Sequence, residues 1–229
     1  MRTIAILPVK TFDAAKQRLA GMLGVGSRQA LAQAMFTDVL TALRRVQGLD
    51  AIVVVTSDRI ADSTALSHRV QTLRDDAQAG QSPAAMIGFG FALGKGFERV
   101  LLVPGDTPLL DPHEVDDLLV EAERRRLAAV VVPDRHGTGT NALLLSPPAV
   151  IEPRFGPGSL ERHLAAVRAA GVPHDTGTLA SLTLDVDTPD DLTELSSLLE
   201  TQHGRAQMTC GALAQLGRSQ VRPKAAASA

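Results

Sequence analysis

The sequence predicts an α/β fold in which a mostly parallel sheet is covered by helices on both faces. Short apolar runs alternate along the chain with amphipathic stretches. The runs are continuous rather than alternating in polarity, which is typical of strands buried on both faces. The 229 residues suffice for a sizeable aliphatic core without any Trp or Tyr. The expected strands are Thr3–Leu7, Ala51–Val55, Val100–Val103, Ala128–Val132, Ala142–Leu145 and Leu182–Val186.

Helix-start signals fall between these runs. Ser27 precedes a helix whose apolar positions recur up to Val46, and Gly48 follows it. Three further starts carry a proline in the first turn, and a fourth begins at a serine. These are Ser82-Pro83, Asp111-Pro112 ahead of Glu114–Arg126, Thr188-Pro189, and Ser159, whose helix Gly171 ends. The repeated strand–helix order predicts a parallel sheet with ligands bound at the carboxyl ends of its strands.

The pattern indicates a single domain over residues 1–202. After about His203 the hydrophobic periodicity weakens, and the end of the chain is rich in Ala, Ser and basic residues. Residues 203–229 are therefore expected to form a disordered tail.

Composition narrows the class of partner and the compartment. The net charge of −2 gives no sign of a nucleic-acid or membrane-surface protein. Cys210 is the single cysteine, so no intrachain disulfide forms and a reducing compartment is expected. No signal peptide and no apolar run of membrane-spanning length is present. We expect a cytoplasmic enzyme whose oligomeric state stays open, with a homodimer as one candidate.

Acidic residues follow two of the expected strands. Asp106 follows Val100–Val103 through a Pro-Gly turn, and Asp185 and Asp187 end the strand Leu182–Val186. Period two in a strand places Asp185 and Asp187 on the same side, where a divalent cation would relieve their repulsion. Asp106 would complete an oxygen-rich Mg²⁺ site. The alternatives are a turn aspartate at Asp106 and a helix cap at Asp187 or Thr188.

Three cations lie in the loop after the first strand. Lys10, Lys16 and Arg18 at a carboxyl end suit a triphosphate, although a solvated surface loop is the alternative. The loop lacks the glycine spacing and the Lys-Ser/Thr pair of a phosphate-binding P-loop.

Three glycine-containing segments offer backbone groups to a ligand. Gly80-Gln81-Ser82 opens a helix, Gly137-Thr138-Gly139-Thr140-Asn141 separates two apolar runs, and Phe155-Gly156-Pro157-Gly158-Ser159 leads into another helix. Their backbone N–H groups suit a base, a phosphate or a carboxylate. A turn, a hairpin loop and an ordinary N-cap at Ser159 explain the same segments without a ligand. His163 faces either the same pocket or the surface.

Taken in order, these segments resemble one family, the phosphoenolpyruvate / 2-phospho-L-lactate guanylyltransferases of coenzyme F-420 synthesis. The resemblance covers about residues 3–200, and the joint order of its motifs is specific. The motifs are Leu-Pro-Val-Lys (7–10), Lys16-x-Arg18-Leu19, Val-Pro-Gly-Asp-Thr-Pro-Leu-Leu (103–110), Pro133-Asp134-Arg135 with Gly-Thr-Asn (139–141), Phe155-Gly156-x-x-Ser159 and Leu-Asp-Val-Asp-Thr-Pro-Asp-Asp-Leu (184–192).

The resemblance implies a fold and a set of roles. The fold is the three-layer sandwich of nucleotidyltransferases, the nucleotide-diphospho-sugar transferase type. One or two Mg²⁺ ions would be held by Asp106, Asp187 and Asp185, and the phosphorylated acid by Thr140, Gly156 and Ser159. The nucleotide end would take Pro8, Lys10, Lys16, Arg18, Gly80, Gln81 and Ser82, and the catalytic set would be Lys10, Lys16, Arg18 and Asp106. The chain departs from the family pattern at two places where the nucleotide would sit, with Gln17 in place of Ser and Gly80-Gln81-Ser82 in place of Gly-Leu-Asn.

The implied reaction joins GMP from GTP to phosphoenolpyruvate or 2-phospho-L-lactate and releases pyrophosphate. Phosphoenolpyruvate is preferred because the Ala/Arg/Leu-rich composition resembles bacterial members. The alternatives are a molybdenum-cofactor or sugar-phosphate nucleotidyltransferase, a glycosyltransferase with an Asp-x-Asp motif, a haloacid-dehalogenase-type phosphatase, and a non-catalytic nucleotide-binding protein. Molybdenum-cofactor and sugar-phosphate nucleotidyltransferases usually have a longer, glycine-rich first loop than this chain has. The late position of Asp185–Asp187 argues against the next two.

Overall fold

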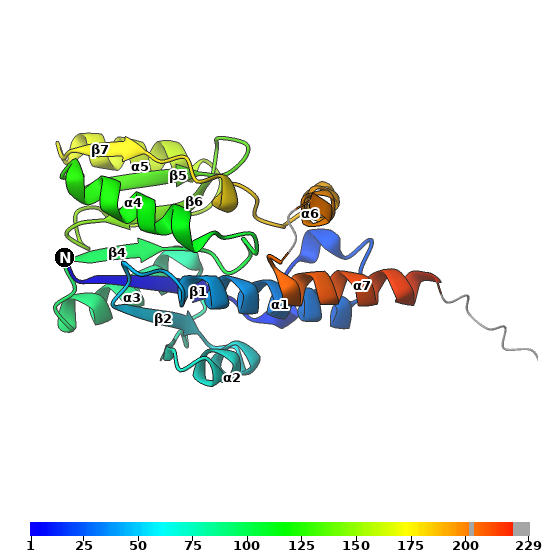
Figure 1. Ribbon diagram of the computed structural model, residues 1–229. Coiled ribbons are helices and arrows are strands. Elements are labelled where there is room, and N and C mark those ends of the chain that lie inside the picture. The colour runs from blue at the N-terminus through cyan, green and yellow to red at the C-terminus, as the bar shows by residue number, and fades with distance from the viewer. Residues whose placement is uncertain (202–203, 222–229) are drawn as a thin grey trace, which may run out of the picture.

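A seven-stranded sheet forms the centre of the protein, with strand order β3-β2-β1-β4-β6-β5-β7. The computed structural model describes residues 1–201 and 204–221 (Figure 1). The strands are β1 (Thr3–Val9), β2 (Ala51–Thr56), β3 (Gln71–Arg74), β4 (Arg99–Leu102), β5 (Ala129–Pro133), β6 (Thr140–Leu145) and β7 (His174–Thr176).

The sheet is mostly parallel, as predicted. Strands β3, β2, β1 and β4 run parallel to one another, and β5 and β7 are parallel to each other. Only β6, among the described strands, is antiparallel, and it pairs with β4 on one side and β5 on the other. The segment between β5 and β6 is therefore a hairpin connection, as the ligand-free alternative for the Gly137–Asn141 stretch proposed.

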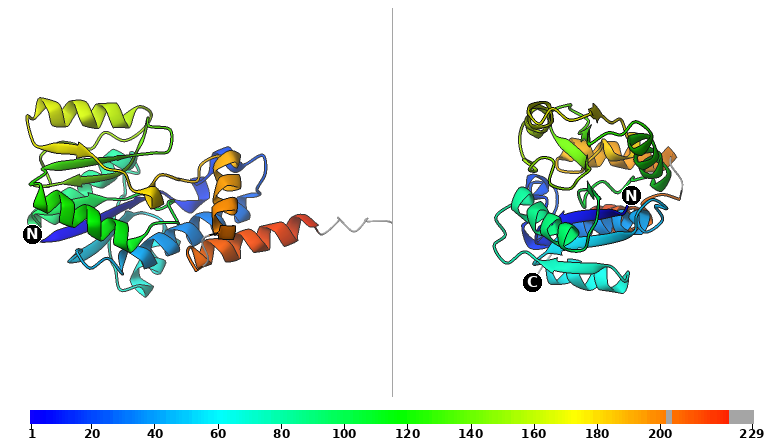
Figure 2. Two further views of the ribbon diagram at one scale, coloured as in Figure 1. Left: turned by 45° about the horizontal axis from the view of Figure 1, so that its top comes forward. Right: turned by 90° about the vertical axis from the view of Figure 1, so that its left-hand side faces the viewer.

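Helices cover both faces of the sheet, which gives the predicted three layers (Figure 2). One face carries α1, α2 and α4, and the other carries α3 and α5. The helices are α1 (Val25–Leu43), α2 (Arg59–Ser67), α3 (Gln81–Gly94), α4 (Pro112–Arg124), α5 (Ser159–Ala169), α6 (Pro189–Thr201) and α7 (Gln207–Val221), with short 3₁₀ turns at η1 (Phe12–Ala14), η2 (Gln17–Leu19) and η3 (Ala180–Leu182). Within the described residues, no helix has the length and apolar character needed to cross a bilayer.

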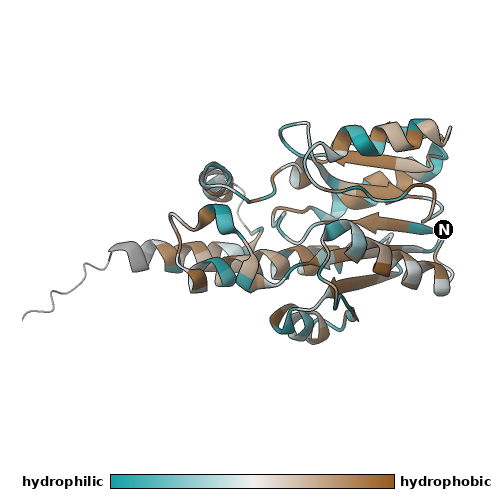
Figure 3. Cartoon of the chain, turned by 180° about the vertical axis from the view of Figure 1, so that it is seen from behind, coloured by the Kyte–Doolittle hydropathy of each residue, from teal (hydrophilic) through white to brown (hydrophobic). Residues whose placement is uncertain are grey.

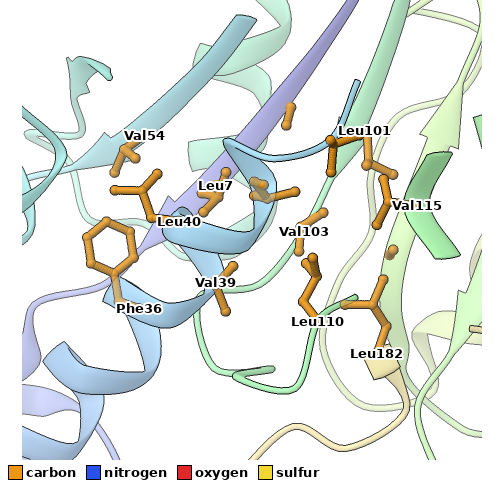
Figure 4. Packing of buried hydrophobic residues seen from close by; sticks show 14 of the residues in the cluster. Leu7, Phe36, Val39, Leu40, Val54, Leu101, Val103, Leu110, Val115 and Leu182 are labelled. Atoms are coloured by element: carbon orange, nitrogen blue, oxygen red, sulfur yellow. The ribbon is translucent and has the colours of Figure 1, made fainter. Parts of the chain in front are cut away.

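The core is aliphatic and continuous along the central strands (Figure 3). On one face, Phe36 and Leu40 of α1 pack with Leu7, Val54 and Leu101 of three neighbouring strands (Figure 4). On the other face, Gly88 brings α3 close to β1. A Cβ atom at this position would lie 2.4 Å from Ile6 Cγ2, so only glycine fits. This close approach fixes the start of α3 relative to the carboxyl end of β1.

Two predictions about the end of the chain are wrong. Leu182–Val186 is not a strand, because Leu182 lies in η3 and the residues after it make no ladder with the sheet. The apolar alternation has another cause. Leu184 and Val186 are buried against α1 and α6 rather than inside the sheet. The apolar pattern therefore predicted correctly that these side chains are buried, but they pack against helices and not within the sheet.

Residues 203–229 are likewise not a disordered tail throughout. Residues 207–221 form α7, which runs beside α1 (Figure 1), whereas 202–203 and 222–229 lie outside the described residues. Buried Asp38 of α1 accepts hydrogen bonds from the Thr209 amide at 2.8 Å and the Met208 amide at 3.1 Å, and so caps the new helix. Leu213 and Leu216 of α7 pack against a hydrophobic cluster that includes Met35 of α1 and Leu195 of α6.

Candidate active site

The candidate site lies at the carboxyl ends of β1 and β4, where the chain passes into loops (Figure 1). The turn after β4 carries Asp106, and its carbonyl accepts a hydrogen bond from the Val186 amide at 3.2 Å. This bond brings the segment from Thr183 to Thr188 beside the turn. Asp185 and Asp187 therefore reach Asp106 without belonging to a strand.

Lys16 lies between two of the carboxylates. Its Nζ atom is 2.5 Å from Asp106 Oδ2 and 3.0 Å from Asp187 Oδ1, and its side chain is 6% exposed. The backbone of Lys16 is left-handed, with φ of 54°, which turns the side chain back over the loop. Burial disfavours the ammonium, but the attraction of Asp106 and Asp187 prevails, and the pKa of Lys16 is raised.

The other two predicted cations are placed more loosely. Arg18 is largely exposed, and its guanidinium is 3.9 Å from Asp187 Oδ2. Lys10 is exposed, and its side chain makes no hydrogen bond or ion pair with any residue in the described part of the chain. Pro8 is half-buried in β1, opposite Val55 of β2. The three cations thus divide into one buried at the acidic cluster and two free to meet a ligand.

Asp185 is held by Asn141, a residue to which the sequence analysis gave no role. The Asn141 amide donates to Asp185 Oδ1 at 3.1 Å and to the carbonyls of Leu182 at 2.8 Å and Thr183 at 3.1 Å. Burial raises the pKa of Asp185, and the negative charges of Asp106 and Asp187 raise it further. A carboxylate in this setting is stabilised by a nearby cation.

The helix cap falls on Thr188, which leaves Asp187 free. Asp191 Oδ2 accepts from the amides of Asp187 at 2.9 Å and Thr188 at 2.6 Å, while Thr188 Oγ1 accepts from the Asp191 amide at 3.3 Å. Arg135 Nη2 lies 2.5 Å from Asp191 Oδ1 and secures this capping box. The cap alternative is thereby settled in favour of Thr188, and Asp187 presents its carboxylate to Lys16.

The opposite end of the site is built around the start of α5. The Leu160 amide donates to the Thr138 carbonyl at 3.2 Å, which ties α5 to the hairpin loop before Thr140. Gly158, with φ of 71°, is the N-cap residue, so the expected cap at Ser159 is wrong. Ser159 is 2% exposed, and its hydroxyl has no hydrogen-bond partner within the described residues. The Ser159 amide donates to the Gly156 carbonyl at 3.0 Å, and His163 of the same helix contacts Thr140. That Thr140, Gly156 and Ser159 bind the phosphorylated acid stays a prediction.

Arg162 organises the loop before α5, and the sequence analysis missed it. Its guanidinium donates to the carbonyls of Arg154 at 3.1 Å, Phe155 at 3.3 Å and Gly156 at 3.2 Å, and also to that of Pro157. With these carbonyls gathered on Arg162, the amides of Gly156 and Gly158 make no hydrogen bond inside the described region. Paired free amides in a glycine-rich turn suit an anion.

Gly80, Gln81 and Ser82 form the start of α3, between the two ends of the site. The helix begins at Gln81, two residues before the predicted first helical position at Pro83, and Gly80 has φ of 116°. Ser82 Oγ accepts a hydrogen bond from the Phe155 amide at 2.9 Å. This bond joins the predicted nucleotide segment to residues 154–158 before α5, which are called the acceptor loop below. A separate cavity of about 340 Å³ lies between α4 and the segment after β7, and no predicted site residue lines it.

The donor chemistry of the acidic cluster fits a hard cation. Asp106, Asp185 and Asp187 supply oxygen ligands, which Mg²⁺ prefers. The Lys16 ammonium at present neutralises two of them, and over the described residues no group of three or more His, Cys, Asp or Glu side chains is arranged to hold a metal ion. A metal at this place would require the Lys16 side chain to turn away.

Comparison with known proteins gives a consistent family. The family described as Guanylyl transferase CofC like matches residues 3–228. A phosphoenolpyruvate guanylyltransferase from Conexibacter woesei is 48% identical over 219 residues, covering 96% of this chain and 98% of that protein. A 2-phospho-L-lactate guanylyltransferase from Methanothermobacter thermautotrophicus is 34% identical over 205 residues, covering 90% of this chain and 89% of that protein.

Solved structures agree on the fold. A protein from Desulfovibrio desulfuricans G20 that carries the assignment nucleotide-diphospho-sugar transferase has a TM-score of 0.75 and 15% sequence identity, covering 96% of this chain and 98% of that chain. The predicted nucleotidyltransferase type of α/β sandwich is thus confirmed.

Proposed function

The chain belongs to the CofC-like guanylyl transferase family, and we propose on that basis that it transfers GMP from GTP to phosphoenolpyruvate, with release of pyrophosphate, as a step in coenzyme F-420 synthesis. It is an enzyme of the nucleotidyltransferase class. Phosphoenolpyruvate is preferred over 2-phospho-L-lactate because the Conexibacter relative, at 48% identity, bears that name. The observation that carries the proposal is the contact of buried Lys16 with Asp106 and Asp187.

In the proposed reaction the nucleotide lies across the carboxyl ends of β1 and β4. The exposed cations Lys10 and Arg18 bind the triphosphate. Asp106, Asp185 and Asp187 would hold one or two Mg²⁺ ions. When bound, Mg²⁺ would neutralise negative charge on the triphosphate. Lys16 then turns from the carboxylates toward the phosphates, where its positive charge stabilises the departing pyrophosphate.

The phosphorylated acid takes the opposite end of the site. The free amides of Gly156 and Gly158, together with the hydroxyl groups of Ser159 and Thr140, bind its anionic groups. A phosphate oxygen of the acid attacks the α-phosphorus of GTP in line, and pyrophosphate leaves. The attacking oxygen is already anionic, so this step requires no general base.

Pyrophosphate release tests the proposal directly. Purified protein would be incubated with Mg²⁺, one nucleoside triphosphate and one phosphorylated acid at a time. We expect release only when GTP and phosphoenolpyruvate are both present. If GTP gives release with 2-phospho-L-lactate but not with phosphoenolpyruvate, the proposed reaction would stand and its acceptor would be 2-phospho-L-lactate. Absence of release with every acceptor, from folded protein that binds GTP, would contradict the proposal.

Substitution of one acidic residue separates chemistry from folding. We expect Asp187→Ala to lower kcat by about 10²-fold or more, because the charge that balances the bound cation is lost. Asp190→Ala is the matched control, since Asp190 is an exposed carboxylate in the first turn of α6. Circular dichroism would establish that both variants fold. Near-normal turnover by folded Asp187→Ala protein would remove Asp187 from the catalytic set.

A further inference from the structure

His163 is a fully buried imidazole whose two ring nitrogens both make hydrogen bonds. Nε2 lies 2.7 Å from the Arg154 amide nitrogen, and Nδ1 lies 2.9 Å from Thr140 Oγ1. The ring also meets Phe155 edge-on, with the ring centroids 5.2 Å apart. His163 therefore connects the acceptor loop, through Arg154, with the first residue of β6, through Thr140.

The Arg154 contact determines the direction of the Thr140 contact. A backbone amide only donates, so Nε2 must accept and carries no proton. Burial, reinforced by the positive charges of Arg162 and Arg154, lowers the pKa of His163 to about 4. A ring that is neutral at neutral pH then carries its single proton on Nδ1 and donates it to Thr140 Oγ1.

Thr140 is left with an unused proton. Its hydroxyl accepts from His163 and makes no other hydrogen bond within the described residues, and the side chain is 8% exposed. A hydroxyl that already accepts one strong hydrogen bond is oriented to donate its own proton elsewhere. The free amides of Gly156 and Gly158 present donors of the same kind on the neighbouring loop.

We propose that His163 is a positioning residue that makes Thr140 a directed hydrogen-bond donor toward the anionic group of the acceptor. The inference rests on the proposed function, since it assumes that the phosphorylated acid binds at Thr140. It specifies the class of group that this end of the site accepts. The preferred ligand atom is an oxyanion oxygen, which only accepts hydrogen bonds. A ligand hydroxyl in its place could also accept from Thr140, but its own proton would find no acceptor in this contact.

The tautomer of His163 tests the first step without reference to catalysis. Long-range ¹H–¹⁵N correlation spectra of the ¹⁵N-labelled protein distinguish the two neutral tautomers and the imidazolium, and the signals absent from His163→Asn protein identify this ring. We expect a neutral ring with the proton on Nδ1 at pH 7. A proton on Nε2, or an imidazolium at that pH, would overturn the inference even if the enzyme is fully active.

A double-substitution cycle tests the second step. In His163→Asn the side-chain amide keeps a donor near the position of Nδ1, whereas in His163→Leu that donor is lost. We expect His163→Leu to raise the KM for phosphoenolpyruvate by about 10-fold, which is the effect of one hydrogen bond, while the KM for GTP changes by less than about twofold. His163→Asn should recover most of the loss.

The Thr140→Val background completes the cycle. If His163 acts through the Thr140 hydroxyl, its replacement by Leu adds less than about twofold to the acceptor KM once that hydroxyl is gone. Fully additive effects, or an equal rise in the KM for GTP, would show that His163 merely supports the fold. If the unsubstituted protein shows no turnover but His163 carries its proton on Nδ1, the result would count against the proposed function and not against this inference.

Discussion

The two ends of the candidate site differ in the kind of chemical group that they present. At the nucleotide end, full charges meet: Lys16 is buried between Asp106 and Asp187, and Asp185 lies beside them with a raised pKa. At the acceptor end, the groups that the proposed ligand would meet are neutral, namely two backbone amides and two hydroxyls. Burial keeps the His163 imidazole behind Thr140 uncharged by lowering its pKa to about 4. Charge at the first end suits a triphosphate whose charge changes during the reaction. Directed hydrogen bonds at the second end suit orientation of a smaller anion.

Removal of the buried Lys16 ammonium should have the largest effect on activity, and this effect should arise at the nucleotide end. We expect Lys16→Met to lower kcat/KM by roughly 10²–10³-fold, because the buried ammonium beside Asp106 and Asp187 is the group proposed to stabilise the departing pyrophosphate. The same change leaves Asp106 and Asp187 without their cation. Thermal unfolding should then show a larger rise in Tm on addition of Mg²⁺ than in the parent protein.

Lys10→Met is the control for the thermal measurement, because Lys10 contacts no carboxylate within the described residues. An equal Mg²⁺-dependent rise in Tm for Lys16→Met and the parent would mean that Lys16 and the metal do not share these carboxylates.

Disruption of the acceptor loop should have a smaller and one-sided effect. Arg162→Gln removes the guanidinium that gathers the carbonyls of residues 154–157, so the free amides of Gly156 and Gly158 lose their orientation. We expect the KM for phosphoenolpyruvate to rise by about 10-fold, with little change in the KM for GTP. Arg168→Gln, on the same helix but paired with Glu161, is the control. A similar loss in both variants would point to helix α5 as a whole.

Neutralisation of Asp185 should have the smallest effect on the fold, and it should be favourable. The pKa of Asp185 is raised in the folded protein, so its ionised form costs stability at neutral pH, and that cost disappears as the pH falls through the folded-state pKa. Asp185→Asn should therefore raise Tm by roughly 2–4 °C at pH 7, as about 1 kcal/mol does in a protein of this size. The gain should shrink toward pH 4 in thermal scans. An undiminished gain at low pH would assign it to packing instead.

Sequence patterns predicted the strands that depend on burial and missed those that depend on a neighbour. The central strands β1, β2, β4, β5 and β6 are apolar on both faces, and each was predicted within two residues of its observed bounds. Strands β3 and β7 are short, polar and at the two edges of the sheet. These two strands form because they pair with β2 and β5, and segments of four and three residues are too short to show a periodic pattern.

The candidate site shows the same division. The positions of Asp106, Thr140 and Ser159 followed from local signals, namely a turn after a strand and glycines before a helix. The pairing of Lys16 with Asp187 joins residues 171 positions apart and depends on a left-handed backbone at a non-glycine residue. Arg162 and His163 are adjacent on α5 and both bond the backbone of Arg154, but only His163 also reaches Thr140. Helical spacing gives the direction of each side chain only once the surrounding loop is placed.

Strand β6 begins with Thr140 and Asn141, and these two neighbours serve different ends of the site: Thr140 meets His163, and Asn141 meets Asp185. Side chains alternate along a strand, so one inserted or deleted residue here would exchange the two faces. The contact of Thr140 with His163 and that of Asn141 with Asp185 would then be lost together. The start of β6 is therefore far less free to vary than the exposed loop before it, where an added residue can bulge outward without changing the register of the strand.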